Sequence, residues 1–273
     1  MKCLGEHASL NAIHDAVSNL CPKSFGCGKF ESSTSTYFLV TDFLNLSGRS
    51  SASSSGKKVP TLAEKLAQLH TQAAPIPNGY TKAQFGFPVT TCCGDTPQDN
   101  TYRESWADFY ANNRLRFILK RSERSNGKDP ELAELVEATA SRVVPRLLGD
   151  DHLNNGKGVI PVVVHGDLWS GNASKGVIGT TGLVRDVIYD PSACYAHSEF
   201  DLGIMKMFGG FGGSFLKEYH SMCPKSEPQD EYADRVLLYE LYHHLNHHAL
   251  FGGGYRSGAI SIMRKLLRTY DTS

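Results

Sequence analysis

The chain has 273 residues, of which 40% are hydrophobic and 21% charged, enough to bury one large core or two lobes that share a cleft. Lys plus Arg and Asp plus Glu both number 28, so the formal net charge is zero, which argues against a general nucleic-acid binder or a protein held on anionic membranes. The seven cysteines form no C-x-x-C pair, no apolar run approaches the roughly 18 residues that span a bilayer, and the first residues lack the apolar core of a signal peptide. We therefore expect a soluble, reduced, cytoplasmic protein.

The first 60 residues predict a helix, a strand and a linker. Apolar residues recur at helical spacing from Gly5 to Leu20, and Pro22 ends this helix. The aromatic and β-branched run at 35–43 predicts a strand. Residues 47–58 are rich in Ser and Gly without apolar periodicity, which indicates a flexible linker.

The remainder of the chain is predicted to be mostly helical. Residues 71–100 carry many Pro, Gly and Thr and are expected to be largely irregular. Asp129 followed by Pro130 combines a capping side chain with a first-turn proline, and so marks the start of a helix. The helices that we expect cover residues 61–70, 106–118, 130–148, 201–208, 213–220, 230–250 and 258–270.

Two short apolar runs, at 159–164 and 183–189, predict strands that each lead into an acidic residue, Asp167 and Asp190. Asn172 follows Asp167 by five positions. Oxygen ligands from an Asn and an Asp suit Mg²⁺, and an acid that does not bind the metal can accept a proton from an attacking hydroxyl. Because the catalytic loop of protein kinases has the same order and spacing, these residues favour phosphoryl transfer.

The sequence around these residues resembles the fructosamine/ketosamine-3-kinase family, relatives of aminoglycoside and choline kinases. The Trp within HGDLWSGN is more specific than the H-G-D core alone. The resembling segments, which cover nearly the whole chain, are 5–10 (GEHASL), 165–172 (HGDLWSGN), 190–195 (DPSACY), 199–202 (EFDL), 208–211 (FGGF) and 241–246 (LYHHLN).

The resemblance implies an α+β, protein-kinase-like fold of two lobes, with a truncated N-terminal lobe and a mostly helical C-terminal lobe. Residues 1–46 would be the remnant of the first lobe, 47–60 a flexible linker, and 61–273 the C-terminal lobe with the catalytic loop. The implied activity is ATP- and Mg²⁺-dependent phosphorylation of a sugar hydroxyl on ketosamines. These include fructosamine and ribulosamine adducts on protein lysines, so the partners would be ketosamine small molecules or glycated proteins, with no nucleic acid or membrane.

The resemblance also implies roles on the acceptor and metal side of the site. Asp167 would be the base that faces the substrate hydroxyl, and Trp169 would pack beside the sugar, although burial in the core is an alternative for an aromatic residue. Asn172 and Asp190 would hold Mg²⁺ against the phosphates. Asp201 would hydrogen-bond the backbone of the catalytic loop, with a simple helix N-cap as the alternative.

On the nucleotide side, the resemblance assigns Glu6 to the glutamate that pairs with a phosphate-binding strand lysine, with stabilisation of the helix dipole as the alternative. Asp42, Phe43 and Leu44 belong to the strand and hinge at 37–44, whose backbone would receive the adenine.

Kinases of this type carry a Gly-rich loop and the strand lysine before the first helix, whereas this sequence starts almost at that helix. Lys2 lies only four residues before Glu6, too close for a separate strand. We therefore expect weak or no kinase activity from these 273 residues, and partial exposure of the apolar face of the first helix, formed by Leu10, Ile13 and Val17.

Two other functions remain open. One is a non-catalytic, pseudokinase-like binding module, favoured by the absent loop and lysine. The other is a kinase for a different small-molecule hydroxyl, of the aminoglycoside or choline type, although the L-W-S insert at 168–170 favours ketosamines.

A zinc site is not expected from the four histidines near the C-terminus. They share one predicted helix at i and i+4 spacing, but no Glu lies between them as in H-E-x-x-H, and no third ligand is evident. Packing and surface roles are therefore predicted for His243, His244, His247 and His248.

Overall fold

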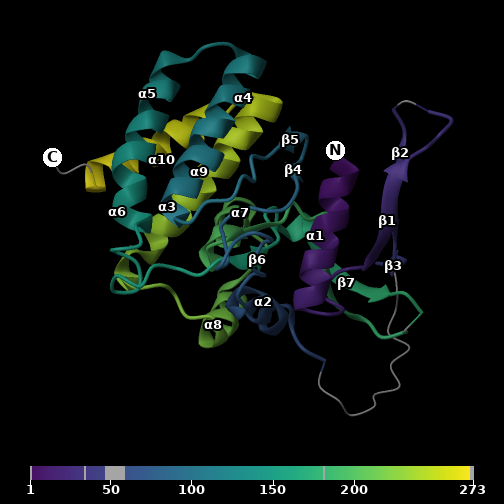
Figure 1. Cartoon of the computed structure of the whole chain (residues 1–273). Coiled ribbons are helices and arrows are strands. Elements are labelled where there is room, and N and C mark those ends of the chain that lie inside the picture. The colour runs from purple at the N-terminus through teal and green to yellow at the C-terminus, as the bar shows by residue number, and fades with distance from the viewer. Residues whose placement is uncertain (1, 34, 47–58, 181, 271–273) are drawn as a thin grey trace.

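The computed structural model describes residues 2–33, 35–46, 59–180 and 182–270 (Figure 1). Most of the linker expected at 47–60 lies outside the described residues. The helices are α1 (Lys2–Ala16), α2 (Leu62–Thr71), α3 (Trp106–Phe109), α4 (Phe117–Asn126), α5 (Pro130–Ala138), α6 (Val144–Leu148), α7 (Asp201–Phe208), α8 (Gly213–Met222), α9 (Tyr232–Phe251) and α10 (Tyr255–Tyr270). The strands are β1 (Ser24–Lys29), β2 (Tyr37–Thr41), β3 (Leu44–Asn45), β4 (Cys92–Cys93), β5 (Thr96–Pro97), β6 (Val162–Val164), β7 (Ala173–Ile178), β8 (Arg185–Ile188) and β9 (Cys194–Ala196).

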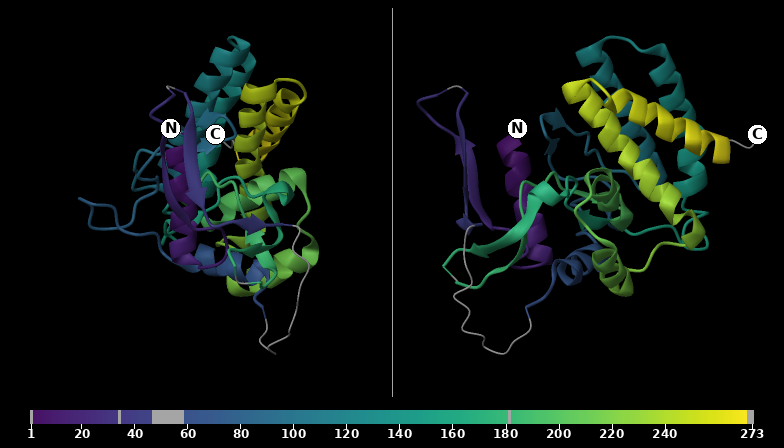
Figure 2. Two further views of the ribbon diagram at one scale, coloured as in Figure 1. Left: turned by 90° about the vertical axis from the view of Figure 1, so that its right-hand side faces the viewer. Right: turned by 180° about the vertical axis from the view of Figure 1, so that it is seen from behind.

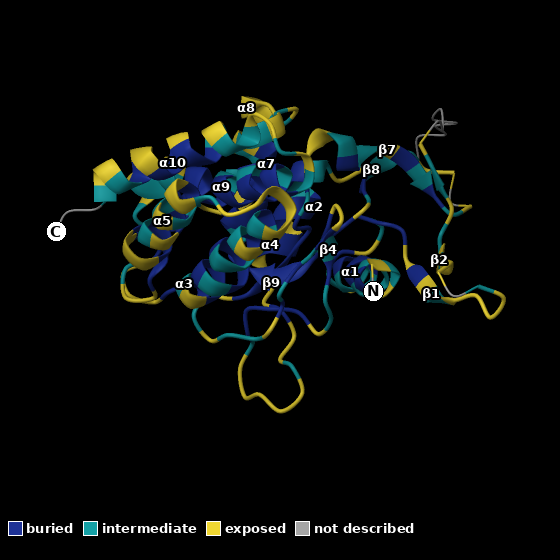
Figure 3. Cartoon of the chain, turned by 90° about the horizontal axis from the view of Figure 1, so that it is seen from above, coloured by how far each residue is buried: buried dark blue, intermediate teal, exposed yellow. Residues whose placement is uncertain are grey.

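Helix α9 is the centre of the molecule and packs against α4, α7 and α10. It is buried on most of its faces, whereas α5 and α10 expose their outer faces (Figure 3). Around it lies an aromatic cluster centred on Trp106, whose indole N–H donates to the Tyr239 hydroxyl at 2.8 Å. The rings of Phe109, Tyr110, Tyr239 and Phe200 lie within 5.6–6.0 Å of that indole. A fully buried Trp whose N–H is satisfied gains its large apolar area without a desolvation penalty, so this cluster anchors the helical body.

The Asp129 cap predicted from the sequence is present, and a second side-chain cap begins α2. Thr61 accepts from the Glu64 N–H while the Glu64 carboxylate accepts from the Thr61 N–H, a capping box that begins α2. Asp129 accepts from the Leu132 N–H at 3.1 Å at the start of α5. The expected helix at 130–148 is continuous but passes through a π-helical segment, Thr139–Val143, between α5 and α6.

Helix α1 differs from the expectation in its bounds and in its burial. It begins at Lys2 and ends at Ala16, because Asn19 adopts a left-handed backbone conformation with φ 62° and turns the chain before Leu20. The predicted partial exposure of its apolar face is wrong, since Leu10, Ile13 and Val17 are all buried in the core that it shares with the C-terminal part of the chain. The Ser9 hydroxyl, also buried, accepts from the Ala193 N–H at 3.0 Å and ties α1 to the segment after β8.

The strands form small, separate sheets. Antiparallel β1 and β2 make a two-stranded hairpin, while β3, β7 and β8 make a three-stranded sheet, and β6 pairs with β9. Figures 1 and 2 show the hairpin on the outer side of α1, away from the helical body. Strands β1, β4, β5, β7 and β9 were not predicted, and the predicted strands at 35–43, 159–164 and 183–189 are shorter in the structure.

All seven cysteines lie among the described residues and all are free thiols. No described helix is long and apolar enough to cross a membrane.

Candidate active site

The loop that follows β6 carries the sequence H-G-D and is fixed by a buried acid. Asp201, fully buried at the start of α7, accepts from the His165 N–H at 2.8 Å and from the Gly166 N–H at 2.7 Å. Its carboxylate also lies 3.2 Å from Nε2 of His70, whose Nδ1 lies 2.8 Å from the Tyr219 hydroxyl. The predicted contact between Asp201 and the loop backbone is therefore confirmed, and Asp201 caps no helix N–H of α7.

Gly166 is required at its position for two reasons. Its φ is +81°, and a Cβ there would lie 2.2 Å from the Ser192 carbonyl oxygen. The Ser192 N–H in turn donates to the His165 carbonyl at 2.9 Å. These contacts hold the start of the loop at 165–172 directly against the segment at 190–195.

Burial shifts the pKa values of two side chains of the loop, Asp167 and His165. The pKa of Asp167 rises to about 7, first because the carboxyl is largely desolvated and second because Asp190 places a like charge near it, while a hydrogen bond with Cys93 acts in the opposite direction. Burial also lowers the pKa of His165, which keeps this ring neutral, with Nε2 3.0 Å from the Tyr189 carbonyl oxygen. The Asp167 carboxyl thus titrates near neutral pH, the range that suits a general base.

Asn172 and Asp190 are brought together by the antiparallel pair of β7 and β8. The register pairs Ala173 with Ile188, so the residue before β7 and the residues after β8 are neighbours, and the Tyr189 N–H donates to the Asn172 carbonyl at 3.1 Å. The Asn172 amide nitrogen donates to the Asp167 carbonyl at 2.9 Å, which directs its amide oxygen away from that loop. Asp190 is exposed and adopts a left-handed conformation with φ 57°.

Glu6 belongs to the same acidic group. The pKa of Glu6 is raised first by burial and second by the charge of Asp190, with Lys2 acting in the opposite direction. Lys2 lies one turn before Glu6 on α1 and pairs with Asp95 at 3.2 Å, with both side chains exposed. Asp190 thus repels both Glu6 and Asp167, and oxygen donors of this kind fit Mg²⁺.

The predicted hinge lies at the far end of the same sheet. Leu44 on β3 pairs with Ile178 at the end of β7, roughly 17 Å along that strand from Ala173 at 3.3 Å per residue. The Phe43 carbonyl accepts from the Gly179 N–H at 2.8 Å, and the Asp42 carboxylate accepts from the Lys23 N–H at 3.0 Å. The structure therefore does not gather residues 42–44 around Asp167.

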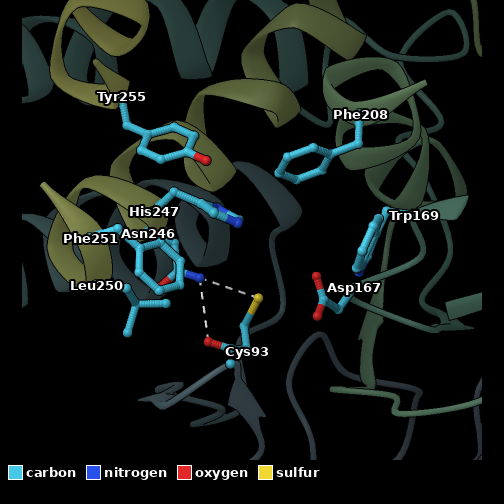
Figure 4. A pocket seen from close by; sticks show the side chains of 10 residues that line it. Cys93, Asp167, Trp169, Phe208, Asn246, His247, Leu250, Phe251 and Tyr255 are labelled. Atoms are coloured by element: carbon cyan, nitrogen blue, oxygen red, sulfur yellow. Dashed lines mark hydrogen bonds between the residues drawn. The ribbon is translucent and has the colours of Figure 1, made fainter. Parts of the chain in front are cut away.

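A pocket of about 280 Å³ opens in front of Asp167 (Figure 4). Trp169 is 38% exposed, and its ring lies 5.6 Å from that of Phe208, so it forms part of the pocket wall rather than of the core. The opposite wall comes from α9 and the start of α10. The lining residues are Cys93, Gly94, Asp167, Trp169, Phe208, Asn246, His247, Leu250, Phe251 and Tyr255.

Sequence reasoning missed several of these residues as site residues. Phe208 and Asn246 lie in segments that carry the family resemblance, so that resemblance was an available signal. No sequence signal indicated Cys93, because the segment at 71–100 was expected to be irregular. None indicated the contact between His70 and Asp201, because the helix at 61–70 was predicted from its leucines alone.

Comparisons with known proteins identify the family of this chain. The model of the family "Fructosamine kinase" matches residues 3–269. A ketosamine-3-kinase of Mus musculus is 40% identical over 183 residues, which cover 67% of this chain and 54% of that protein. A "probable ketoamine kinase" of Synechocystis is 41% identical over 207 residues, which cover 76% of this chain and 61% of that protein. A chloroplastic protein-ribulosamine 3-kinase of Oryza sativa is 36% identical over 264 residues, which cover 97% of this chain and 68% of that protein. The chain thus spans 54% and 61% of the mouse and Synechocystis relatives.

Solved structures show the fold. A "putative fructosamine-3-kinase" from Haemophilus somnus superposes with a TM-score of 0.72 at 22% identity, covering 97% of this chain and 79% of that one. The aminoglycoside phosphotransferase APH(4)-Ia, in a ternary complex with AMP-PNP and hygromycin B, has a TM-score of 0.54 at 14% identity, with 97% of this chain and 83% of that one covered. The predicted α+β, protein-kinase-like fold is confirmed, and the chain belongs to the fructosamine kinase family.

Proposed function

We propose that this protein transfers the γ-phosphoryl group of ATP to a sugar hydroxyl of ketosamines, either free or attached to protein lysines, with fructosamine and ribulosamine adducts as the substrates. The observation that carries the proposal is the position of the Asp167 carboxyl, which faces an aromatic-walled pocket and titrates near pH 7. The pocket volume of about 280 Å³ suits a single sugar with its linkage. The names of the mouse and rice relatives support this substrate class.

In the proposed reaction, Asp167 accepts the proton of the sugar hydroxyl while the hydroxyl oxygen attacks the γ-phosphorus of ATP. The new bond is between the sugar oxygen and phosphorus, and the bond to the departing ADP breaks. Trp169 presents an aromatic face against which the C–H groups of the sugar pack. Asp201 holds the loop backbone, and thus the Asp167 carboxyl, in one position.

Asn172 and Asp190 are the residues that would hold Mg²⁺. The repulsion of Asp190 with Glu6 and with Asp167 supports this assignment, because a cation relieves it. A bound Mg²⁺ would supply positive charge against the phosphates of ATP. Glu6 and the backbone of residues 42–44 are proposed on the nucleotide side, and the AMP-PNP complex of a structural neighbour supports ATP as the donor. We propose a cytoplasmic location for the protein. The alternative is the chloroplast, which the name of the rice relative indicates for that protein. Localisation of a tagged chain tests the two.

The proposal is tested by measuring ATP- and Mg²⁺-dependent phosphorylation of a fructosamine and a ribulosamine substrate with the parent and Asp167→Asn. We expect the variant to lower kcat by about 10²–10⁴-fold, because it keeps the shape of the side chain but cannot accept the proton. ATP binding, measured by calorimetry, should be nearly unchanged. The control is Asp230→Asn, an exposed acid before α9, which should keep the parental rate.

Parental turnover in Asp167→Asn would exclude Asp167 as the base. The competing functions give different results in the same assays. A non-catalytic binding module would be stabilised by ketosamine in a thermal-shift titration but show no turnover and no stabilisation by Mg·ATP. A kinase of the aminoglycoside or choline type would phosphorylate those alcohols in preference to ketosamines.

A further inference from the structure

Three side chains from distant parts of the sequence converge beside the pocket: Cys93 on β4, Asp167 on the loop after β6 and His243 on α9. Their potential ligand atoms, one from each residue, all lie within 4.8 Å of one another. The sequence around the helical histidines offers neither the Glu of H-E-x-x-H nor a further zinc ligand. The fold supplies two such ligands to one of these histidines.

His243 is fully buried, and neither of its ring nitrogens has a hydrogen-bond partner among the described residues. Burial lowers the pKa of His243 to about 3, so the ring is neutral and carries a free lone pair. Leaving a buried polar group unpaired costs about 1–3 kcal/mol, and a ligand that binds this lone pair would remove that cost. A neutral imidazole with an unused nitrogen is the form in which histidine binds metals.

Cys93 presents its sulfur to the same point. The thiol is 1% exposed, and its sulfur accepts from the Asn246 side-chain amide at 3.3 Å. The same amide donates to the Cys93 carbonyl at 3.3 Å, which fixes the orientation of the pair. Figure 4 shows the Cys93 sulfur facing the Asp167 carboxylate across a short gap. An N–H donor to the sulfur is the kind of outer contact that supports a metal-bound thiolate.

Burial raises the pKa of the Cys93 thiol, so a metal ion bound there would displace its proton to solvent. The resulting thiolate, with an imidazole and a carboxylate, selects Zn²⁺ over Mg²⁺, because Mg²⁺ prefers oxygen ligands. In a tetrahedral zinc site with bonds of about 2.0–2.3 Å, the ligand atoms lie roughly 3.3–3.8 Å apart, so the three side chains need to approach by about 1 Å. Three protein ligands leave a fourth position open. Cys93 and Asp167 line the pocket, so an ion that enters from solvent meets them first, with His243 behind.

We propose that Cys93, Asp167 and His243 form a Zn²⁺ site in the pocket wall, separate from the Asn172 and Asp190 pair, and that an ion bound there inhibits phosphoryl transfer by occupying the Asp167 carboxylate. The binding half of the proposal is independent of the proposed function, whereas the inhibition half rests on it. The ion and a substrate hydroxyl compete for the same carboxylate oxygens.

The binding half is tested with Co²⁺, a spectroscopic substitute for Zn²⁺ whose bond to a thiolate gives a near-ultraviolet charge-transfer band. The protein is titrated with Co²⁺ in Mg²⁺-containing buffer and the band is then displaced by Zn²⁺. The test variants are Cys93→Ser and His243→Leu. The matched controls are Cys92→Ser, the adjacent cysteine, and His247→Gln, one turn further along α9.

We expect one band of 1:1 stoichiometry in the parent and in both controls. Cys93→Ser should lose the band, and His243→Leu should weaken Co²⁺ affinity at least about tenfold. If Cys93→Ser fails to fold, as judged by circular dichroism, His243→Leu carries the test. The absence of a band in the parent, or a parental band in Cys93→Ser, would overturn the site.

The inhibition half is tested by adding Zn²⁺ to the ketosamine phosphorylation assay at fixed Mg·ATP. We expect the Zn²⁺ concentration for half-inhibition to rise at least tenfold in His243→Leu relative to the parent and to Cys92→Ser, whose side chain does not line the pocket. Chelation of ATP by Zn²⁺ affects all forms equally and cannot produce this difference. Equal inhibition of all forms would overturn the inhibitory role, whereas a Co²⁺ band without phosphorylation in any form would leave the site intact and contradict the proposed function.

Discussion

The loop at 165–172 and the β1–β2 hairpin are built in opposite ways. The loop is held by a fully buried acid that accepts two of its backbone N–H groups, and the strand before it, β6, lies in the core. The hairpin is held by its own backbone ladder and by one face of α1, and its apolar side chains are largely exposed. The exposed aromatic residues on or beside the hairpin are Phe25, Phe30, Tyr37, Phe38 and Phe43.

This difference shows where a substitution acts. Removing a side chain that has many fixed neighbours changes the loop geometry and lowers the free energy of unfolding. A side chain that contacts mainly water changes little. The acceptor side of the proposed site is therefore expected to be sensitive, and the hinge side to be tolerant.

The largest effect is expected at Asp190, which lies between the two regions. Asp190→Ala should abolish Mg²⁺-dependent nucleotide binding, because it removes a charged ligand from the ion that offsets the phosphate charge. Since Asp190 has φ 57°, Ala also adds backbone strain, and Asp190→Asn is the control that tolerates this conformation while removing the charge. Titration calorimetry that gives parental Mg·ATP affinity in both variants would show that Asp190 does not bind the metal.

The second effect concerns the acid under the loop. Asp201→Asn should lower the free energy of unfolding by about 3 kcal/mol, because an amide cannot accept from both backbone N–H groups and also contact His70 as the carboxylate does. Chemical denaturation measures this loss, with the exposed Asp230→Asn as the control. A loss equal to that of the control would show that the loop does not depend on Asp201.

The same variant has a pH signature. Burial alone would raise the pKa of Asp201, but the His70 hydrogen bond, the nearby imidazoles and the His165 N–H outweigh it, so the pKa lies below its ordinary value. A lowered pKa means that the stabilisation is complete above the unfolded value of about 3.9 and is lost as the pH falls through the folded value. The stability difference between parent and Asp201→Asn should therefore shrink only in strong acid, and a constant difference down to unfolding would contradict the assignment.

A smaller effect is expected at the pocket wall. Trp169→Ala should raise KM for the ketosamine about tenfold with a lesser change in kcat, because one aromatic contact contributes about 0.5–1.5 kcal/mol. Trp169→Phe keeps an aromatic face and should stay within about threefold of the parent. A purely structural Trp169 would instead lower stability and leave KM unchanged in the folded variant.

The smallest effect is expected in the hinge. Phe43 is 75% exposed, so Phe43→Ala should change the free energy of unfolding by less than about 0.5 kcal/mol. ATP affinity should also hold, because the proposed adenine contact is made by the backbone. The matched control, Phe200→Ala in the aromatic core, should cost about 3–5 kcal/mol. Similar losses in the free energy of unfolding for both variants would show that the two regions do not differ in this way.

The sequence by itself determined the features that depend on local spacing. The catalytic-loop motif gave the order of Asp167 and Asn172, and the position of Asp190 after them matched the order and spacing of the protein-kinase template. Helical periodicity and the Asp129 and Pro130 signal located the helices of the C-terminal part, because these patterns arise within a few turns of one chain. Strand β7 escaped prediction, since it contains Gly176 and no apolar alternation and is stabilised by its partners β3 and β8.

Only the tertiary structure decided what surrounds the reactive carboxyl. Cys93 and His243 reach Asp167 because the fold brings β4 and α9 together beside the loop, and no local pattern records a contact between residues so far apart in the chain. The same packing buried the apolar face of α1, for which partial exposure was expected, and placed His70 and Tyr219 behind Asp201. Local spacing encodes secondary structure and the motif, whereas burial, pKa and ligand geometry depend on which distant surfaces fit together.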